Sequence, residues 1–265
     1  MNKPAVIIIG FCLAVLFGVP LFFQGDYVEI PEGASQVIII SPHNEQIRHE
    51  FGHGFESWHQ EMYGEPAQVV WSVPGGTSEI RRMLISQYKH ALETGKEPGG
   101  EADLVFGGGS YEHGVLKKVI KAKFGEEEVA TTISVPATID QAILDEVYGE
   151  NLIGDITIYD PDGNWHGLAL SGFGIVYNNE VLADLEIESP STWEALCNPA
   201  LFGKLALVNP AQSGSVTTAF EAILKNLGWE RGWQVLRRAA ANARYFSASS
   251  LKPPADVSQG DAAMG

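Results

Sequence analysis

The stretch VIIISPH, residues 37–43, decides the fold. A short apolar run rich in β-branched residues predicts a buried strand, and the Ser-Pro pair after it is typical of a helix cap and first turn. Two further stretches repeat this order: AQVVW at 67–71 leads through GGTS into a helix, and ADLVF at 102–106 leads through GGGS into another. This alternation predicts an α/β fold with a parallel sheet covered by helices.

The same order returns later in the chain. KLALVNP at 204–210 is expected to form a strand, SGS a turn, and the residues after it a helix that ends at Gly228. GFGIVYN at 172–178 predicts one more strand. A chain of 265 residues, 45% of them hydrophobic, can bury the core of one large or two ordinary domains.

The charge balance bears on the choice of partner. The formal net charge is −16, from 33 acidic and 17 basic residues. Binding to phosphate backbones needs a basic face, which this composition is unsuited to assemble. We therefore expect no nucleic-acid partner.

The N-terminus carries a membrane-targeting segment. Residues 5–23 form an apolar run of about the length that a helix needs to cross a bilayer. Lys3 precedes the run and acidic residues follow it, so the remainder of the chain is expected on the extracytoplasmic side of the cytoplasmic membrane. No small-x-small cleavage site follows the run, which favours an uncleaved transmembrane anchor over a removed signal peptide.

The stretch HEFGHGFESWH, residues 49–59, raises an alternative function. His49, Glu50 and His53 have the spacing of the H-E-x-x-H zinc motif, and His59 stands near the place of a third ligand. This pattern suggests a membrane-anchored zinc metalloprotease.

The surrounding residues argue against that metalloprotease. Ile47, Phe51, Phe55, Trp58 and Met62 form one apolar stripe of a helix, expected to face the core, with His49 and His53 opposite it in water. Metzincins end this helix at a glycine, whereas Glu56 stands there in this chain. If the helix runs on, His59 lies about 15 Å along the axis from His49, too far to share a zinc ion.

Small polar residues follow four of the expected strands. Each of these residues taken alone is explained as a helix cap or a turn former, but four such loops together are suited to binding a ligand. Helix starts present unpaired N–H donors that favour anions, and the ends of parallel strands share one edge of a sheet. No nucleotide-binding glycine motif is present, so nucleotide binding is not supported and no cofactor is expected; no serine nucleophile elbow appears either. The four loops are Ser41-Pro42-His43, Gly75-Gly76-Thr77-Ser78, Gly108-Gly109-Ser110 and Ser213-Gly214-Ser215.

Several long stretches resemble the solute-binding components of bacterial ABC importers, in the class that contains the ferric-ion-binding proteins. The most specific runs from Pro190 to Leu236, PSTWEALCNPALFGKLALVNPAQSGSVTTAFEAILKNLGWERGWQVL; VVWSVPGGTSEIRRML, ADLVFGGGSYEHGVLK and ALSGFGIVYNNEVL also match. The resemblance implies a two-lobed periplasmic-binding-protein type II fold without the C-terminal part of the second lobe. The expected parts are an anchor and tether at 1–35, lobe 1 at 36–177 and lobe 2 at 178–265.

The resemblance also implies a function. The lobes would close over a small polar or anionic solute, or a ferric ion, and deliver it to a permease that works with an ATPase subunit. By position, the resemblance implies that nine candidate ligand-binding residues line the cleft between the lobes: Ser41, His43, Gly76, Thr77, Gly109, Ser110, Ser213, Gly214 and Ser215. Of these, His43 could be a ferric ligand or a solvated or capping histidine. A sensor or adhesion module built from the same lobes is a further alternative.

Overall fold

The computed structural model describes residues 15, 33–154 and 156–265. The predicted membrane segment lies outside these residues except for Val15, so the anchor stays a prediction. Among the described residues, no helix combines the length and apolarity needed to span a bilayer. The residues described from 33 onward fall into two compact units, one of residues 33–36 and 50–69 and one of residues 37–49, 70–154 and 156–265. The division into lobes at residue 177 also stays a prediction.

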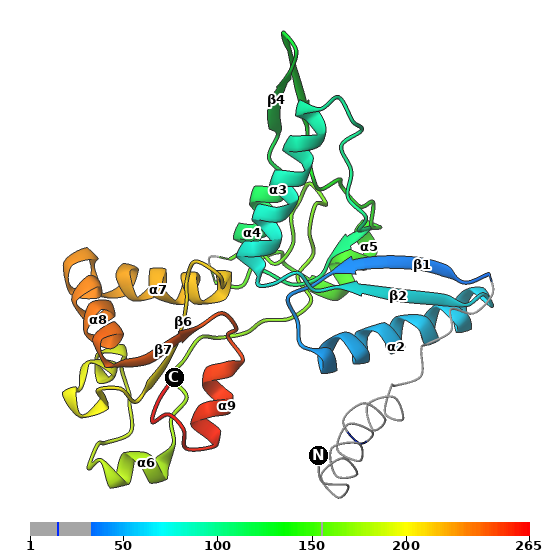
Figure 1. Ribbon diagram of the computed structural model, residues 1–265. Coiled ribbons are helices and arrows are strands. Elements are labelled where there is room, and N and C mark those ends of the chain that lie inside the picture. The colour runs from blue at the N-terminus through cyan, green and yellow to red at the C-terminus, as the bar shows by residue number, and fades with distance from the viewer. Residues whose placement is uncertain (1–14, 16–32, 155) are drawn as a thin grey trace, which may run out of the picture. The chain divides into compact units, whose positions relative to one another are not determined.

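The first sheet has three strands in the order β2-β1-β3 (Figure 1). Their bounds are Ser35–Ile40 for β1, Ala67–Ser72 for β2 and Leu104–Val105 for β3. β1 and β3 run parallel, with Ile39 opposite Leu104 and Ile40 opposite Val105. The three predicted strands are therefore confirmed, as is the parallel pairing of β1 with β3.

A helix follows each of these strands: α2 (Glu45–Tyr63), α3 (Thr77–Glu93) and α4 (Ser110–Leu116). The expected start of α2 at Ser41-Pro42 is wrong. Ser41 Oγ instead accepts a hydrogen bond from the N–H of His43 (3.1 Å), and Asn44 Oδ1 caps the helix by accepting from the N–H of Ile47 (2.9 Å). A four-residue loop therefore separates β1 from α2.

The apolar stripe of α2 is not the buried face that its spacing predicts. Phe51, Trp58 and Met62 are 50%, 46% and 61% exposed. The rings along the helix contact one another instead, with centroids 5.9 Å apart for Phe55 and Trp58 and 5.7 Å apart for Trp58 and Tyr63. Periodicity identified the apolar face but not what lies against it.

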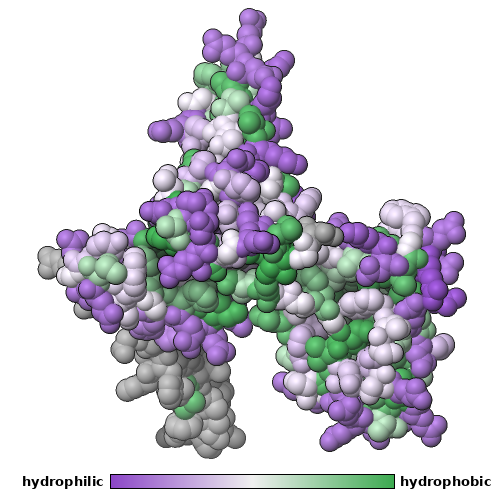
Figure 2. Space-filling view, turned by 180° about the vertical axis from the view of Figure 1, so that it is seen from behind, coloured by the Kyte–Doolittle hydropathy of each residue, from purple (hydrophilic) through white to green (hydrophobic). Residues whose placement is uncertain are grey.

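An antiparallel hairpin that the sequence did not predict follows α4. It pairs β4 (Ile120–Phe124) with β5 (Glu127–Thr131), and an ion pair joins Lys121 Nζ to Glu128 Oε1 at 2.7 Å. Hydrophilic side chains gather over the end of this hairpin (Figure 2). The helix α5 (Gln141–Tyr148) comes next.

The later part of the chain is built around a second parallel pair, β6 (Leu205–Val208) with β7 (Ala243–Ser247). The predicted strand at 204–210 and the helix ending at Gly228 are confirmed as β6 and α7. Trp193–Cys197 forms a 3-10 helix that follows Thr192. The bounds of the remaining elements are α6 Asn179–Asp184, η1 Trp193–Cys197, η2 Pro199–Leu201, α7 Gly214–Leu227, α8 Trp229–Asn242 and α9 Lys252–Ser258.

The expected strand at 172–178 pairs only at its end. The N–H of Val176 donates to the carbonyl of Gly265 (2.9 Å), and the N–H of Gly265 donates back (2.8 Å). Met264, fully buried, lies opposite Tyr177 on one side and Leu205 on the other. Residues 263–265 thus connect the 176–178 segment to β6.

Each of these sheets packs on an apolar cluster of its own. The first packs β1 against α3 and α4 and contains Ile40, Ile80, Leu84 and Leu116. The second surrounds β6 and contains Leu182, Leu196, Leu201, Leu205, Leu207, Ala239, Ala263 and Met264.

Candidate functional site

The histidine motif does not form a metal site. α2 continues through Glu56 to Tyr63, as predicted, and His49 and His53 are exposed. His59 contacts the chain locally, with Nδ1 2.9 Å from the carbonyl oxygen of Glu65. Over the described part of the chain, no three His, Cys, Asp or Glu side chains could hold a metal ion together. The zinc protease is therefore not supported, and a ferric site built from such a group is not found either.

The four predicted loops come together. The loop after β1 meets the loop after β3, where a Cβ added to Gly107 would lie 2.8 Å from His43 Nε2. A Cβ on Gly108 would lie 3.6 Å from Thr77 Cγ2, at the start of α3. The N–H of Gly214, at the start of α7, donates to Thr77 Oγ1 (2.9 Å). Segments 137 residues apart therefore meet at Thr77.

Close backbone approach at this meeting point depends on glycine. A Cβ on Gly76 would overlap the carbonyl oxygen of Gln212, and one on Gly214 would overlap Glu112 Oε1 and Thr77 Oγ1. Gly107 is also required for its conformation, because its φ of +110° is rarely open to other residues. Gly76 and Gly214, which were predicted to bind the ligand, are thus also needed for the loops to come into contact.

The expectation of unpaired amides at these helix starts is wrong. The N–H of Gly76 donates to Glu79 Oε2 (3.0 Å), and the N–H of Gly109 donates to Glu112 Oε2 (3.3 Å). Each glutamate is the third residue of its helix and forms half of a capping box. A glutamate three residues after each glycine was the sequence signal for these bonds.

The other predicted site residues differ in exposure. Ser41 is fully buried, and Ser213 is 6% exposed with its Oγ 3.0 Å from Ser215 Oγ. Ser110 and Ser215 are exposed, and His43 is half-buried with its ring centroid 5.0 Å from that of Phe106. The structure brings all these residues to one region, and their binding of a solute stays a prediction.

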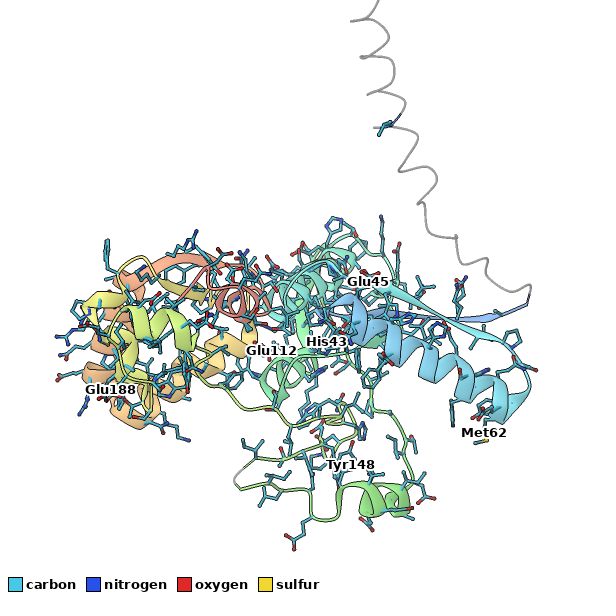
Figure 3. All side chains as sticks on the ribbon, turned by 90° about the horizontal axis from the view of Figure 1, so that it is seen from below. His43, Glu45, Met62, Glu112, Tyr148 and Glu188 are labelled. Atoms are coloured by element: carbon cyan, nitrogen blue, oxygen red, sulfur yellow. The ribbon has the colours of Figure 1, made fainter. Side chains whose placement is uncertain are left out.

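Three residues at this region were missed by the sequence reasoning: Arg81, Glu112 and His113. With Thr77 they supply the polar side chains around a cavity of about 10 Å³, whose other walls include Ile80, Val105 and Leu116. Glu112 is 7% exposed, and Figure 3 labels it on α4 and His43 on the loop before α2. Arg81 follows Thr77 by one helical turn, a spacing that by itself does not mark a site.

Burial sets the charge of the two histidines here. It lowers the pKa of His43 and lowers the pKa of His113, where the contacts with Gly107 and Glu112 act in the opposite direction. His113 Nε2 lies 3.0 Å from the carbonyl oxygen of Gly107, which can only accept, so Nε2 carries the proton. Both imidazoles are therefore biased toward the neutral form.

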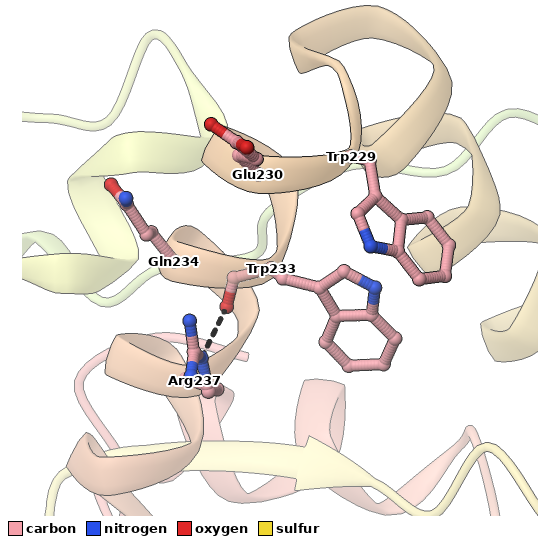
Figure 4. A pocket seen from close by; sticks show the side chains of 5 residues that line it. All are labelled: Trp229, Glu230, Trp233, Gln234 and Arg237. Atoms are coloured by element: carbon pink, nitrogen blue, oxygen red, sulfur yellow. Dashed lines mark hydrogen bonds between the residues drawn. The ribbon is translucent and has the colours of Figure 1, made fainter.

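A second hollow lies on the surface of α8. It is lined by Trp229, Glu230, Trp233, Gln234 and Arg237 (Figure 4). The two indole rings meet edge to face at 5.7 Å, and Arg237 Nε donates to the carbonyl of Trp233 (3.3 Å). All its residues come from one helix, whereas the loops around Thr77 unite several elements. We therefore place the candidate site at those loops.

Comparison with known proteins gives one family match and several structural neighbours. The sequence model of a family described as bacterial extracellular solute-binding protein matches residues 112–264. The phosphoglycerate transport regulatory protein PgtC of Salmonella typhimurium is 30% identical over 84 residues, which are 32% of this chain and 21% of PgtC.

Two solved structures share the fold. The periplasmic binding protein AfuA from Actinobacillus pleuropneumoniae, solved with fructose-6-phosphate bound, matches with a TM-score of 0.63 at 16% identity, over 87% of this chain and 62% of AfuA. The ferric binding protein from Campylobacter jejuni matches with a TM-score of 0.50 at 12% identity, over 86% of this chain and 60% of that protein. The chain thus spans less than two thirds of each, and at these identities the likeness shows the fold alone.

Proposed function

Because the chain belongs to the family of bacterial extracellular solute-binding proteins, we propose that it captures a small polar solute where the loops after β1, β2 and β3 meet the start of α7. The observation that carries this proposal is the hydrogen bond from the Gly214 N–H to Thr77 Oγ1. It joins two parts of the chain with separate apolar clusters at the residues expected to line the site. Closure of two lobes around a solute needs such a meeting point.

The polar groups at this point suit hydrogen bonding more than covalent chemistry. Hydroxyls of Ser41, Thr77, Ser110, Ser213 and Ser215, the imidazole of His43, and the backbone at Gly76, Gly109 and Gly214 are the proposed contacts. The relatives are binding proteins, and the proposed role requires no catalytic step. An anionic solute would have to compete with the Glu79 and Glu112 carboxylates for the amides of Gly76 and Gly109.

The proposed partners are those of an importer. The extracytoplasmic protein would be held by its N-terminal apolar segment, residues 5–23, beside a membrane permease that works with an ATPase subunit. A tether at the cytoplasmic membrane would keep the binder near the permease and raise its effective concentration there.

A thermal-shift screen of the purified protein tests the proposal. The panel contains ferric citrate, phosphonates, sugar phosphates, neutral sugars and polyamines. A compound present at 100 times its dissociation constant adds about 2.7 kcal/mol to the free energy of unfolding, which raises the melting temperature by roughly 5–10 °C. A panel in which no compound shifts the melting temperature would count against solute binding.

A variant pair then locates the site. Thr77→Val removes the acceptor for the Gly214 N–H and should weaken binding of the compound found by about 2- to 10-fold, since a neutral hydrogen bond contributes about 0.5–1.5 kcal/mol. Thr94→Val, at the other end of α3, loses a hydroxyl bonded only to carbonyls of its own helix and should leave affinity unchanged. Equal affinities of the two variants would place the solute elsewhere.

A further inference from the structure

The loop between β6 and α7 is tied down by hydrogen bonds of its own. Asn209 Oδ1 accepts from the N–H of Ala211 (2.9 Å), and the Asn209 carbonyl accepts from the N–H groups of Gln212 and Ser213 (both 3.1 Å). The N–H of Asn209 donates to the carbonyl of Ser247 on β7 (2.8 Å). The loop therefore presents its outward groups, among them the Ala211 carbonyl and the Gln212 side chain, from a turn that is already formed.

Two side chains of α3 bond to this loop. Arg82 Nη1 donates to the carbonyl of Ala211 (3.0 Å), and Glu79 Oε1 accepts from Gln212 Nε2 (3.3 Å). Glu79 and Arg82 are three residues apart, so they project from the same face of the helix. In each bond one partner carries a full charge, which strengthens it relative to a neutral bond. With the bond already described at Thr77, three hydrogen bonds join α3 to the segment that opens α7.

The contact between α3 and this segment has no apolar core. In the part of the chain that the structure describes, no apolar cluster contains residues of both α3 and α7. α3 contributes Ile80 and Leu84 to one cluster, and α7 contributes Ile223 to another. Polar interfaces between two parts of one chain separate readily, because water can replace each hydrogen bond. The contact is therefore suited to open and close.

We propose that Glu79, Arg82 and Gln212 form a latch that holds the starts of α3 and α7 together before any solute arrives. The bonds of the latch use only groups of the chain, so they stabilise the joined state without a solute. The inference rests on the proposed function and adds a control of entry to it. Gly214 is buried in the joined state, so a solute reaches Gly214 and Thr77 only while the latch is open. A site that is joined in advance also loses less conformational freedom when a solute binds.

The N–H of Gly214 reports whether the latch is open. Gly214 is the first residue of α7, where a backbone N–H has no partner within the helix, and its acceptor is Thr77 Oγ1 across the contact. The N–H of Thr217 donates instead to the carbonyl of Ser213, within the same segment (3.1 Å). Opening of the latch therefore exposes the N–H of Gly214 to solvent and leaves that of Thr217 bonded.

Amide hydrogen exchange of the full chain without solute, followed by NMR, tests the inference. Arg82→Met and Gln212→Met keep most of the side-chain length and remove the hydrogen-bond donor. Each should speed exchange of the Gly214 N–H by about 2- to 10-fold, the factor by which one hydrogen bond shifts an equilibrium. Exchange of the Thr217 N–H should not change.

Lys89→Met is the matched control. Lys89 is also exposed on α3, but it pairs with Glu93 of the same helix (3.8 Å), so Gly214 should exchange at the wild-type rate in this variant. Unchanged exchange of Gly214 in both latch variants overturns the inference. So does equal acceleration at Thr217, which would mean that α7 itself unfolds, and so does a Gly214 N–H that exchanges in the wild type as fast as an unbonded amide.

These outcomes are independent of the test of the proposed function. The exchange experiment contains no solute, so its failure removes the latch and leaves solute binding to the thermal-shift screen. A screen in which no compound shifts the melting temperature would instead count against solute binding, while faster Gly214 exchange in the latch variants would still show that α3 holds the start of α7.

Discussion

Gly214→Ala is the sharpest test of the contact between the starts of α3 and α7. The added Cβ would overlap Glu112 Oε1 and Thr77 Oγ1, and Cβ atoms are essentially never found within 3.0 Å of another heavy atom. The Glu112 carboxylate and the Thr77 hydroxyl must therefore move aside, which disrupts the Gly214–Thr77 hydrogen bond. Overpacking of this kind costs about 1–3 kcal/mol, so the free energy of unfolding should fall by that amount.

Urea unfolding followed by tryptophan fluorescence measures this change, and amide exchange of residues 209–218 should become faster in Gly214→Ala. Gly114→Ala is the control, because it lies in α4 near the same region but its Cβ would meet nothing within 4 Å. That variant should be unchanged or up to about 1 kcal/mol more stable, since alanine favours the helix. If Gly214→Ala matches Gly114→Ala in both measurements, the two helix starts are not in contact in solution.

Three further predictions concern the core, pH and zinc. Leu205→Ala should lower the free energy of unfolding by about 2–5 kcal/mol in urea titrations, whereas Leu168→Ala, 67% exposed, should change it little. Burial lowers the pKa of His113, so its contribution to the free energy of unfolding should be complete above pH 6.5 and should be lost as the pH falls through the lowered folded pKa. His113→Gln should reduce this loss of stability at low pH in melting curves, and a pH profile identical to that of the wild type would refute the prediction. Glu50→Ala should retain solute binding, and stoichiometric zinc in the purified protein would contradict that.

Much of the fold could be predicted from local pattern. β1, β2 and β6 are short apolar runs closed by turn residues, and α3 and α7 start at the glycines and hydroxyl residues that follow them. The parallel arrangement of β1 with β3 brought the predicted loops to one edge. These features depend on residues adjacent in sequence, which is why they could be derived without coordinates.

The features that were missed depend on distant residues or on competing local bonds. The spacing of Phe51, Trp58 and Met62 showed an apolar face on α2 but not that the structure leaves these side chains exposed. The Ser41 side chain closes its own turn instead of capping α2, and Asn44 takes that role. Arg81 and Glu112 reach one cavity only because α3 and α4 pack together, which no short motif records.

The backbone bonds between Val176 and Gly265 have a consequence for how the protein is made. They bracket β6, α7, α8, β7 and α9, and Met264 completes the cluster around Leu205. Contacts between segments so distant form slowly, because a long loop must close before they add stability. This part of the molecule should therefore assemble in one cooperative step, and only after Gly265 has left the ribosome.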